Sequence, residues 1–427
     1  MRYKMRWLAV GVLLSCLVNP ATATASKYRW RKGTITISVS TSLTSNVANL
    51  APNADVSGAI DRSISSWQQA AAVSIRRASS PEQNASPTGN QGDGISLLTI
   101  AATPENVALF PKGLDDATAR TRVFYDGRGY ITEADIVLNP YLQFSTDGTH
   151  GTFDLESTLT HEIGHLLGLT HSPVIGATMH DNYGRNGVYS LPAFSARTLS
   201  SDDIASIRTL YGTSESVEDC CGRINGRLLF NTGKAAANYT VWAENADDGR
   251  VVAAVTCASD GSFRMGGLPL EKLRILAQSS DLDPPSPAFG LGEINVSSKL
   301  AVNFVKRIER SNVDSFLDYL GFNGQIAEIA VPVNSGNSYF LLVGSSNIGE
   351  NWNVESSSNL LSITRPAFAG NFADHVKAVG FELSIASNAP EGEYSLSLRN
   401  ASGERRFLIG GVTVERFPNL WSTAIFK

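Results

Sequence analysis

The segment from His161 to His171, which reads His-Glu-Ile-Gly-His-Leu-Leu-Gly-Leu-Thr-His, constrains the fold of this chain more than any other feature. Residues four positions apart lie on one face of a helix, so His161 and His165 present their imidazoles in the same direction. Gly168 permits the helix to end in a left-handed turn, after which the chain can bring His171 to the same point. The spacing predicts a site where three neutral histidines bind one Zn²⁺ ion and leave a fourth position open.

Glu162 stands directly after the first of these histidines, where a general base is needed. An open zinc site activates water near neutral pH, and a neighbouring carboxylate can take the proton and pass it to a departing amine. This combination is typical of amide hydrolysis. The alternative is that the histidines only cap a core helix, and the spacing of all the specified positions argues against it.

The length of 427 residues predicts two or three domains, because a single hydrophobic core rarely grows past about 250 residues. Hydrophobic residues make up 42% and charged residues 18% of the chain, which is typical of a soluble globular protein. The formal net charge of −5 becomes −8, from 32 basic and 40 acidic residues, once the three basic residues before Trp7 are removed. We therefore expect no nucleic-acid partner.

The first 25 residues are expected to be a secretory signal peptide, since basic residues precede an apolar run that ends in Ala-Thr-Ala-Thr-Ala. The run Trp7–Val18 holds 12 residues, too few to cross a bilayer as a helix, so no transmembrane helix is expected. An alternative is a lipid anchor on Cys16, and against it the apolar stretch continues past that residue. We prefer release from the cell, with the mature protein extracellular.

Three cysteines then remain in an oxidising compartment, at Cys220, Cys221 and Cys257. One bridge to Cys257 is expected, and the sequence leaves open whether Cys220 or Cys221 is its partner. The alternative is three reduced, small apolar side chains.

Residues 26–213 are expected to form one domain that mixes strands and helices. Strict alternation over Thr34–Ser40 predicts a half-buried strand, and apolar residues at three- and four-residue spacing predict a helix over Val56–Ala71. Further strands are predicted over Ile95–Ala101, Arg120–Tyr125 and Ile131–Leu138.

The polar stretch Thr213–Asp219 predicts a domain boundary, because helical periodicity disappears after it. Residues 220–306 contain the runs Gly222–Leu229, Tyr239–Ala243 and Asp260–Pro269, which resemble a transthyretin-like or carboxypeptidase-regulatory-like β-sandwich. Residues 310–420 alternate over Tyr339–Val343, Lys377–Ile385 and Tyr394–Leu398, a pattern similar to an immunoglobulin-like sandwich. We thus predict two all-β domains behind an α+β domain.

The histidine segment itself resembles the metzincin zinc peptidases, and its surroundings resemble their matrixin branch. Ser172 follows the third histidine as it does in matrixins, and Ala177-Thr-Met179 is similar to the family's Met-turn. The resemblance covers roughly residues 28–212. It implies an α+β fold with a twisted mixed sheet and an active-site helix. It also implies that Arg120–Tyr125 is the sheet edge beside which a substrate peptide can add, and the alternative is an ordinary internal strand.

By the same resemblance, Met179 is expected to form the hydrophobic floor below the zinc. Tyr183 would line the pocket for the substrate residue after the cleaved bond. One aspartate of the Asp202–Asp203 pair would meet the mature N-terminal amine, although a solvated pair at a helix start explains these residues equally well.

The chain departs from animal matrixins in its histidine content, since it has only the six histidines His150, His161, His165, His171, His180 and His375. The second, structural zinc of those proteins therefore has no counterpart, and one catalytic zinc is expected. Calcium is a further candidate, with Asp147, Asp154 and Glu156 as ligands, although acidic loops are usually just solvated.

These observations predict a secreted zinc endopeptidase whose C-terminal β-domains bind substrate, matrix or a cell surface. The alternative is an adhesion or binding protein in which catalysis is vestigial, and the intact Glu162 argues against it. A metallohydrolase with a substrate other than peptide is a third hypothesis. The sequence leaves the cleavage preference open, because the pocket wall lies in the loop Asp181–Ala196.

Overall fold

The fold was taken from a computed structural model of the chain. It describes residues 28–44, 48–87, 89, 91–182, 184–213, 220–280, 287–297, 300–309, 318–345, 348, 353–364, 368–373 and 376–415. The predicted signal peptide, Cys16 and Tyr183 lie outside these residues. In the part of the chain that is described, no helix is both long and apolar enough to cross a membrane.

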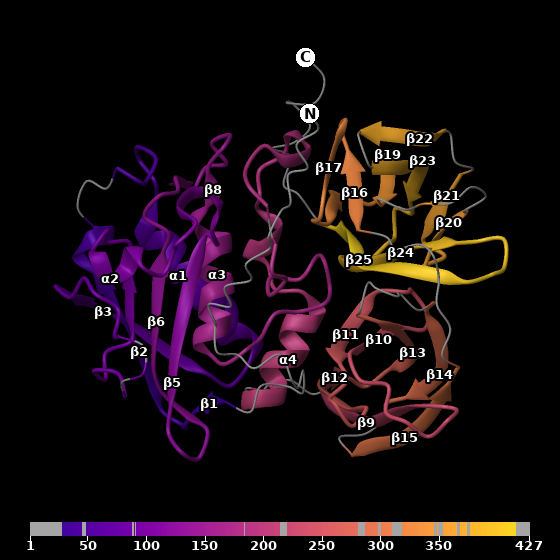
Figure 1. The fold of residues 1–427 in the computed structure, drawn as a ribbon, viewed down its shortest axis with the longest axis horizontal. Coiled ribbons are helices and arrows are strands. Elements are labelled where there is room, and N and C mark those ends of the chain that lie inside the picture. The colour runs from indigo at the N-terminus through magenta and orange to yellow at the C-terminus, as the bar shows by residue number, and fades with distance from the viewer. Residues whose placement is uncertain are drawn as a thin grey trace, which may run out of the picture.

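The first part of the chain is built on a six-stranded sheet in which β1, β6, β4, β2 and β3 follow one another and β5 pairs with the other side of β6 (Figure 1). Neighbouring strands in this sheet run parallel to each other, except that β5 runs antiparallel to β6. Strand β5 forms an edge of the sheet. The strands are β1 (Arg29–Trp30), β2 (Thr34–Ser40), β3 (Ser74–Ser80), β4 (Leu97–Thr99), β5 (Ala119–Tyr125) and β6 (Tyr130–Leu138). A separate short pair joins β7 (Phe144–Ser145) to β8 (Phe153–Asp154).

Three longer helices accompany this sheet: α1 (Val56–Ala70), α3 (Leu155–Leu166) and α4 (Ser201–Tyr211). Asp55, Asp154 and Ser200 cap them, each accepting a hydrogen bond from a backbone N–H in the first turn. The remaining helical turns are α2 (Pro104–Val107) and the 3-10 turns Thr41–Leu43, Gly113–Asp115, Val188–Ser190 and Ser195–Arg197. The predicted strands and the predicted helix therefore agree with β2, β4, β5, β6 and α1 to within two residues.

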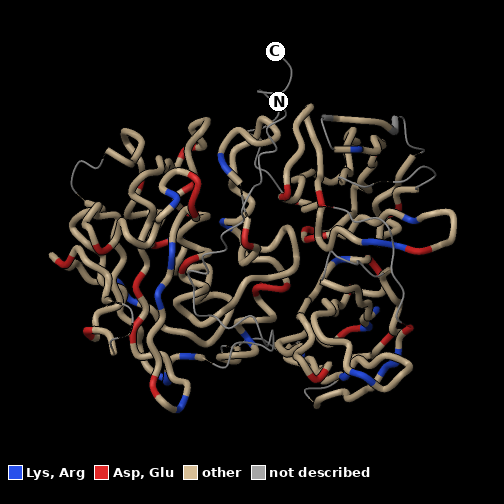
Figure 2. The backbone as a smooth tube through the Cα atoms, viewed as in Figure 1, with Lys and Arg blue, Asp and Glu red and all other residues tan. Residues whose placement is uncertain are grey.

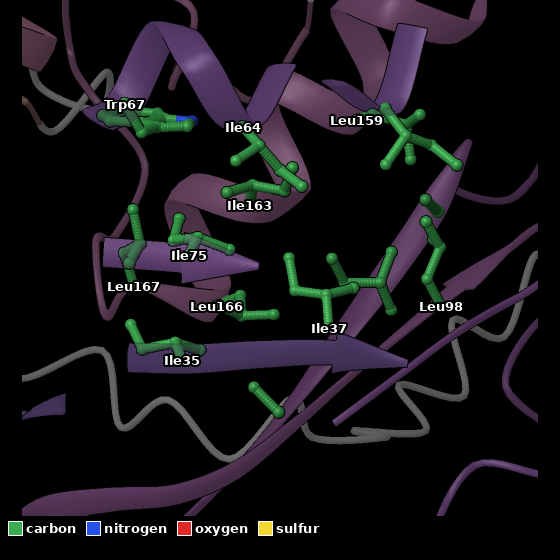
Figure 3. Packing of buried hydrophobic residues seen from close by; sticks show 14 of the residues in the cluster. Ile35, Ile37, Ile64, Trp67, Ile75, Leu98, Leu159, Ile163, Leu166 and Leu167 are labelled. Carbon is green, nitrogen blue, oxygen red and sulfur yellow. The ribbon is translucent and has the colours of Figure 1, made fainter. Parts of the chain in front are cut away.

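The core of this part lies between the sheet and the helices α1 and α3 (Figure 3). Isoleucines from neighbouring strands, such as Ile37 and Ile75, face Ile64 and Trp67 of α1 and Ile163 of α3. The Trp67 side chain is fully buried, and its indole N–H donates to the Thr160 carbonyl at 2.8 Å. This packing holds one face of α3, so the opposite face is left for the histidines.

Residues 220–308, here called the first β-region, form two mostly antiparallel sheets that pack around one shared buried cluster. One sheet has the order β11-β10-β13-β14 and the other β12-β9-β15. The strands are β9 (Cys220–Phe230), β10 (Tyr239–Asn245), β11 (Val251–Thr256), β12 (Ser262–Pro269), β13 (Lys272–Ser279), β14 (Phe289–Asn295) and β15 (Ala301–Ile308).

Residues 318–415, here called the second β-region, also form two sheets around a shared cluster. One has the order β17-β16-β19-β23-β21 with β22 beside β23, and the other has the order β18-β25-β24-β20. The strands are β16 (Tyr319–Phe322), β17 (Gln325–Ala327), β18 (Val331–Val333), β19 (Ser338–Ser345), β20 (Asn353–Ser356), β21 (Leu361–Ile363), β22 (Phe368–Ala373), β23 (Val376–Ile385), β24 (Gly392–Arg399) and β25 (Arg405–Val414). The described chain is thus α+β up to Tyr211 and rich in strands after Cys220, while the division into domains stays a prediction.

The two β-regions lie against the first part along α4 and the loops before it (Figure 1). A buried cluster joins all three through Ala177, Trp242, Ala254 and Phe407. Lys and Arg are interspersed with Asp and Glu over all three parts (Figure 2). The prediction that nucleic acid is not a partner stays untested.

The disulfide prediction is wrong. Cys220 is bonded to Cys221, its direct neighbour, and Cys257 is a buried free cysteine. Cys257 packs in the core of the first β-region, where burial raises the pKa of its thiol to about 12. It therefore serves as a small apolar core residue, and the alternative of three reduced cysteines is wrong as well.

Candidate metal centre and active site

The helix α3 carries His161 and His165 one turn apart, and it ends at Leu166. Gly168 follows with φ +97°, and a Cβ at this position would lie 2.2 Å from the Tyr28 carbonyl oxygen. Only glycine suits both the left-handed backbone and the close approach of Tyr28. The turn brings His171 back, so that one nitrogen from each of the three imidazoles lies within 4.8 Å of the others.

Backbone carbonyls orient two of these rings. His161 Nδ1 lies 2.7 Å from the Thr178 carbonyl, and His165 Nδ1 lies 2.9 Å from the Leu169 carbonyl. Since a carbonyl only accepts hydrogen bonds, each Nδ1 carries the proton and each Nε2 keeps its lone pair. The Nε2 atoms of His165 and His171 are 3.2 Å apart and face the same space.

Burial and mutual proximity keep these imidazoles uncharged. Burial lowers the pKa of His161 well below its ordinary value and also lowers that of His165. His171 is more exposed than the other two histidines, yet its partial burial and, to a smaller extent, the nearby His165 lower its pKa to about 4. Three neutral imidazoles, two of them oriented by backbone carbonyls, fit Zn²⁺, which takes histidine nitrogen readily and needs neutral imidazole.

Glu162 lies beside this cluster with 4% of its surface exposed. Burial raises the pKa of its carboxyl to about 7, although a hydrogen bond from Thr121 opposes the shift. Thr121 Oγ1 lies 2.5 Å from Glu162 Oε2, and it belongs to the edge strand β5. The carboxylate is therefore held between the active-site helix and the sheet edge, with a proton affinity suited to accepting a proton near neutral pH.

Met179 is buried, with 2% of its surface exposed. Its sulfur packs on α3 at Gly164, where an added Cβ would lie 2.2 Å from Met179 Sδ. The backbone N–H of Ser172 donates to the Met179 carbonyl at 2.8 Å, which closes the turn from His171 to Met179. The structure thus brings Met179 and the three histidines together.

Asp203 holds this turn in place, a role that the sequence did not reveal. Its carboxylate accepts the backbone N–H groups of Thr178 at 2.8 Å and Met179 at 3.0 Å, and it also completes the cap of α4 with Ser200. The Ser-Ser-Asp-Asp pattern indicates a capping box but says nothing of the Met179 turn. Thr121 was missed for the same reason, since its contact with Glu162 is a tertiary one.

Asp202 accepts hydrogen bonds from Ser172 Oγ at 2.5 Å and from the Ala254 backbone N–H at 2.7 Å. Both aspartates of the pair therefore have protein partners. The N-terminus lies outside the described residues, so its contact with this pair stays a hypothesis.

The calcium candidates are engaged with neighbouring side chains. Asp154 forms an ion pair with Arg197 at 2.5 Å, and Glu156 forms one with Arg62 at 2.8 Å. Asp147 accepts hydrogen bonds from Thr149. A calcium ion at these residues stays a prediction.

Three histidines on α3 and the turn after it, a buried glutamate on the same helix and a methionine packed against that helix resemble the site of the metzincin class. Comparison with known proteins narrows this class, because residues 117–212 match the family model of matrixins. This part of the chain is accordingly a matrixin-like metzincin domain.

Individual relatives with matching sequences are also metalloproteinases. Mouse matrilysin is 44% identical over 70 residues, which cover 16% of this chain and 24% of matrilysin. Metalloendoproteinase 1 of Glycine max is 37% identical over 93 residues, 21% of this chain and 25% of the relative. Metalloendoproteinase 1-MMP of Arabidopsis thaliana is 28% identical over 200 residues, 44% of this chain and 45% of the relative. The chain thus spans less than half the length of these curated relatives.

Among solved structures, the major pilin subunit BcpA of Bacillus cereus is similar over 46% of this chain and 69% of its own, with 13% identity and a TM-score of 0.15. So low a score supports no conclusion about fold or function.

Proposed function

We propose that this protein is a secreted zinc-dependent endopeptidase and that its two C-terminal β-regions are sandwich domains that assist its action on protein substrates. The observation that carries the proposal is the convergence of three neutral imidazoles next to the buried carboxylate of Glu162. Zinc, when bound, would supply Lewis-acid activation of water and of the scissile carbonyl.

The residues of the chain itself perform the remaining steps. Glu162 takes the proton of the attacking water and delivers it to the departing amine, and the hydrogen bond from Thr121 fixes the position of the carboxylate. Strand β5 offers a sheet edge along which an extended peptide can add as an antiparallel strand. Thr121 lies on this strand, so the peptide bond would pass close to Glu162.

The test compares wild type with Glu162→Gln, which keeps the size of the side chain and removes the base. Wild type is expected to bind one zinc and to cleave unfolded casein or gelatin, and a chelator should abolish cleavage. Glu162→Gln should retain zinc and lose at least about a hundredfold in kcat/KM. Glu105→Gln, at an exposed position on α2, is the matched control and should behave as wild type.

A zinc-loaded wild type that leaves casein, gelatin and peptide libraries intact would refute the peptidase. That result would favour the alternative, an adhesion or binding protein with vestigial catalysis.

A further inference from the structure

The segment 180–197, considered without residue 183, leaves the Met179 turn and runs between α3 and the second β-region. Here it is called the wall segment. It begins directly after Met179, whose neighbour Thr178 orients His161, and it returns to α3 where Ser157 Oγ donates to the Ala193 carbonyl at 2.8 Å. The wall segment therefore borders the histidine cluster, while Thr121 on β5 contacts Glu162 from another element.

On the side of the catalytic domain, Asn186 fixes the wall segment. Asn186 is 1% exposed, and its side chain accepts the Ala193 N–H at 2.8 Å and donates to Thr152 Oγ1 at 3.1 Å. Its backbone N–H donates to the Thr152 carbonyl at 2.9 Å. One half of the segment is thus tied to the loop just before α3.

On the other side, Tyr189 enters the second β-region. Its ring is 1% exposed and belongs to the buried cluster of that region. Its hydroxyl lies 3.0 Å from the carbonyl oxygens of both Leu320 and Ile329, and one of them accepts its proton at any moment. A tyrosine of the catalytic domain therefore forms part of the core of a region that begins about 130 residues later.

Side chains of the second β-region also bind the backbone of Tyr189. Gln325 Oε1 accepts the Tyr189 N–H at 2.8 Å, and Asn323 Nδ2 donates to the Tyr189 carbonyl at 2.8 Å. Tyr189 and Ser190 both have positive φ, at +58° and +59°, which ordinary side chains adopt only when surrounding contacts impose it. The hairpin that joins β16 to β17 supplies those contacts.

Beside Tyr189, a pocket lies between the wall segment and the second β-region. Asn182, Arg185, Val188 and Leu191 line it from the segment, and Ile329 and Pro332 line it from the β-region. Leu191 also belongs to the buried cluster of the second β-region, and Ile329 packs close to Gly184, so this region contacts the wall segment on both sides of Tyr189. Figure 1 shows these loops, in magenta, between α3 and β17.

We propose that the second β-region is a structural part of the substrate site: by binding Tyr189, it sets the position of the wall segment and thereby the preference for the substrate side chain next to the cleaved bond. This inference rests on the proposed peptidase function. A peptide lying along β5 would direct alternate side chains toward α3 and the wall segment, where the size of the available space decides which side chains fit. Tyr189, Asn323 and Gln325 are then positioning residues, since none needs to touch the substrate.

Two variants test the anchor without changing a residue that contacts the histidines. Asn323→Gly removes the amide that binds the Tyr189 carbonyl and tolerates the positive φ of +49° at this position. Tyr189→Phe keeps the ring and removes the hydroxyl. Asn400→Ala, on the β24–β25 hairpin, removes a side-chain amide bonded only to Glu404 within the described residues, and is the matched control.

Hydrogen exchange is the first readout, because it needs no activity. The N–H groups of Gly187 and Leu191 donate to carbonyls inside the wall segment, so no substituted side chain bonds them directly. In zinc-loaded Asn323→Gly and Tyr189→Phe these amides should exchange about fivefold to tenfold faster than in wild type. Exchange as slow as in wild type and Asn400→Ala would overturn the inference.

Cleavage of a peptide library is the second readout. The ratio of kcat/KM for large against small side chains next to the cleaved bond should change about fivefold or more in the two variants, with zinc content unchanged. An unchanged ratio would overturn the inference while leaving the peptidase intact. If wild type cleaves no peptide, the proposed function is wrong and so is the inferred control of side-chain preference. The exchange rates then still show whether Tyr189 orders the wall segment.

Discussion

Contacts from more than one element set the orientation and the pKa of the Glu162 carboxyl. It sits on the same helix as two of the histidines, yet its orientation depends on Thr121, which comes from a strand 41 residues earlier. Burial favours the protonated carboxyl, and the Thr121 hydroxyl, as a donor, favours the carboxylate. The hydroxyl thus opposes the effect of burial and fixes the direction in which the group points.

Replacing Thr121 by Val should lower kcat by about tenfold to a hundredfold with little change in KM, because a hydrogen bond to a charged group is lost while the shape is kept. Zinc content should remain that of wild type. Steady-state kinetics with a fluorogenic peptide measure both constants, and Thr121→Ser should restore most of the activity. A Thr121→Val variant as active as wild type would show that Glu162 needs no support from β5.

At the scale of elements, the site depends on how α3 ends. The chain after α3 must reverse direction to place His171 near His161 and His165. The left-handed turn at Gly168 makes this reversal possible. Asp203, at the start of α4, binds two N–H groups of the Met179 turn and so fixes the Thr178 carbonyl that orients His161. Two elements separated by more than thirty residues therefore hold one metal site.

Gly168→Ala should reduce zinc affinity, because the new Cβ would meet the Tyr28 carbonyl and push the return to His171 away. Gly403→Ala is the control, since Gly403 also has positive φ, at +85°, and only the end of the Arg399 side chain lies near its Cβ position. Both variants should lose about 1 kcal/mol of stability from backbone strain, and Gly168→Ala should lose more because its Cβ also meets the Tyr28 backbone. Zinc titration with a competing chelator separates them, and equal affinities would argue against the role of the Gly168 turn.

The elements that the sequence predicted are those whose pattern is local. Alternation over β2 and helical spacing over α1 come from one buried face, and the histidine spacing needs only a helix and a turn. The strand β3 was missed because its residues Ser-Ile-Arg-Arg-Ala-Ser-Ser are mostly exposed at the sheet edge, which leaves no apolar alternation. The cysteines were misassigned because pairing depends on which sulfurs meet in space, and Cys257 faces a core.

Across the whole molecule, acidic groups are buried where the three parts meet. Glu393 of β24 is 5% exposed, and its Oε2 has no hydrogen-bond partner among the described residues. Gly176 of the loop between His171 and Met179 packs directly on it, and the charges of Asp202 and Asp203 face it from α4. Burial, reinforced by Asp203 and Asp202, raises the pKa of Glu393 to about 8.

This shift makes contact between the parts sensitive to pH. The unfolded carboxyl ionises near its ordinary value of 4.5, whereas the folded one holds its proton until about pH 8. The stability it contributes is therefore complete below about pH 4.5 and is lost as pH rises through 8. Glu393→Gln should melt a few degrees above wild type at pH 8.5 and close to it at pH 5, by calorimetry. A constant difference at both pH values would exclude ionisation of Glu393 as the cause.

The anchoring of Tyr189 also has a consequence for the order in which the molecule is made. Synthesis proceeds from the N-terminus, so the histidines emerge from the ribosome well before Leu320 and Ile329, which bind the Tyr189 hydroxyl. The N–H of Ile175, between His171 and Met179, pairs still later with the carbonyl of Ile409. A nascent chain can thus gather the three histidines early but completes the surroundings of the site only after residues 320–409 have emerged, so the proposed peptidase site forms late in folding.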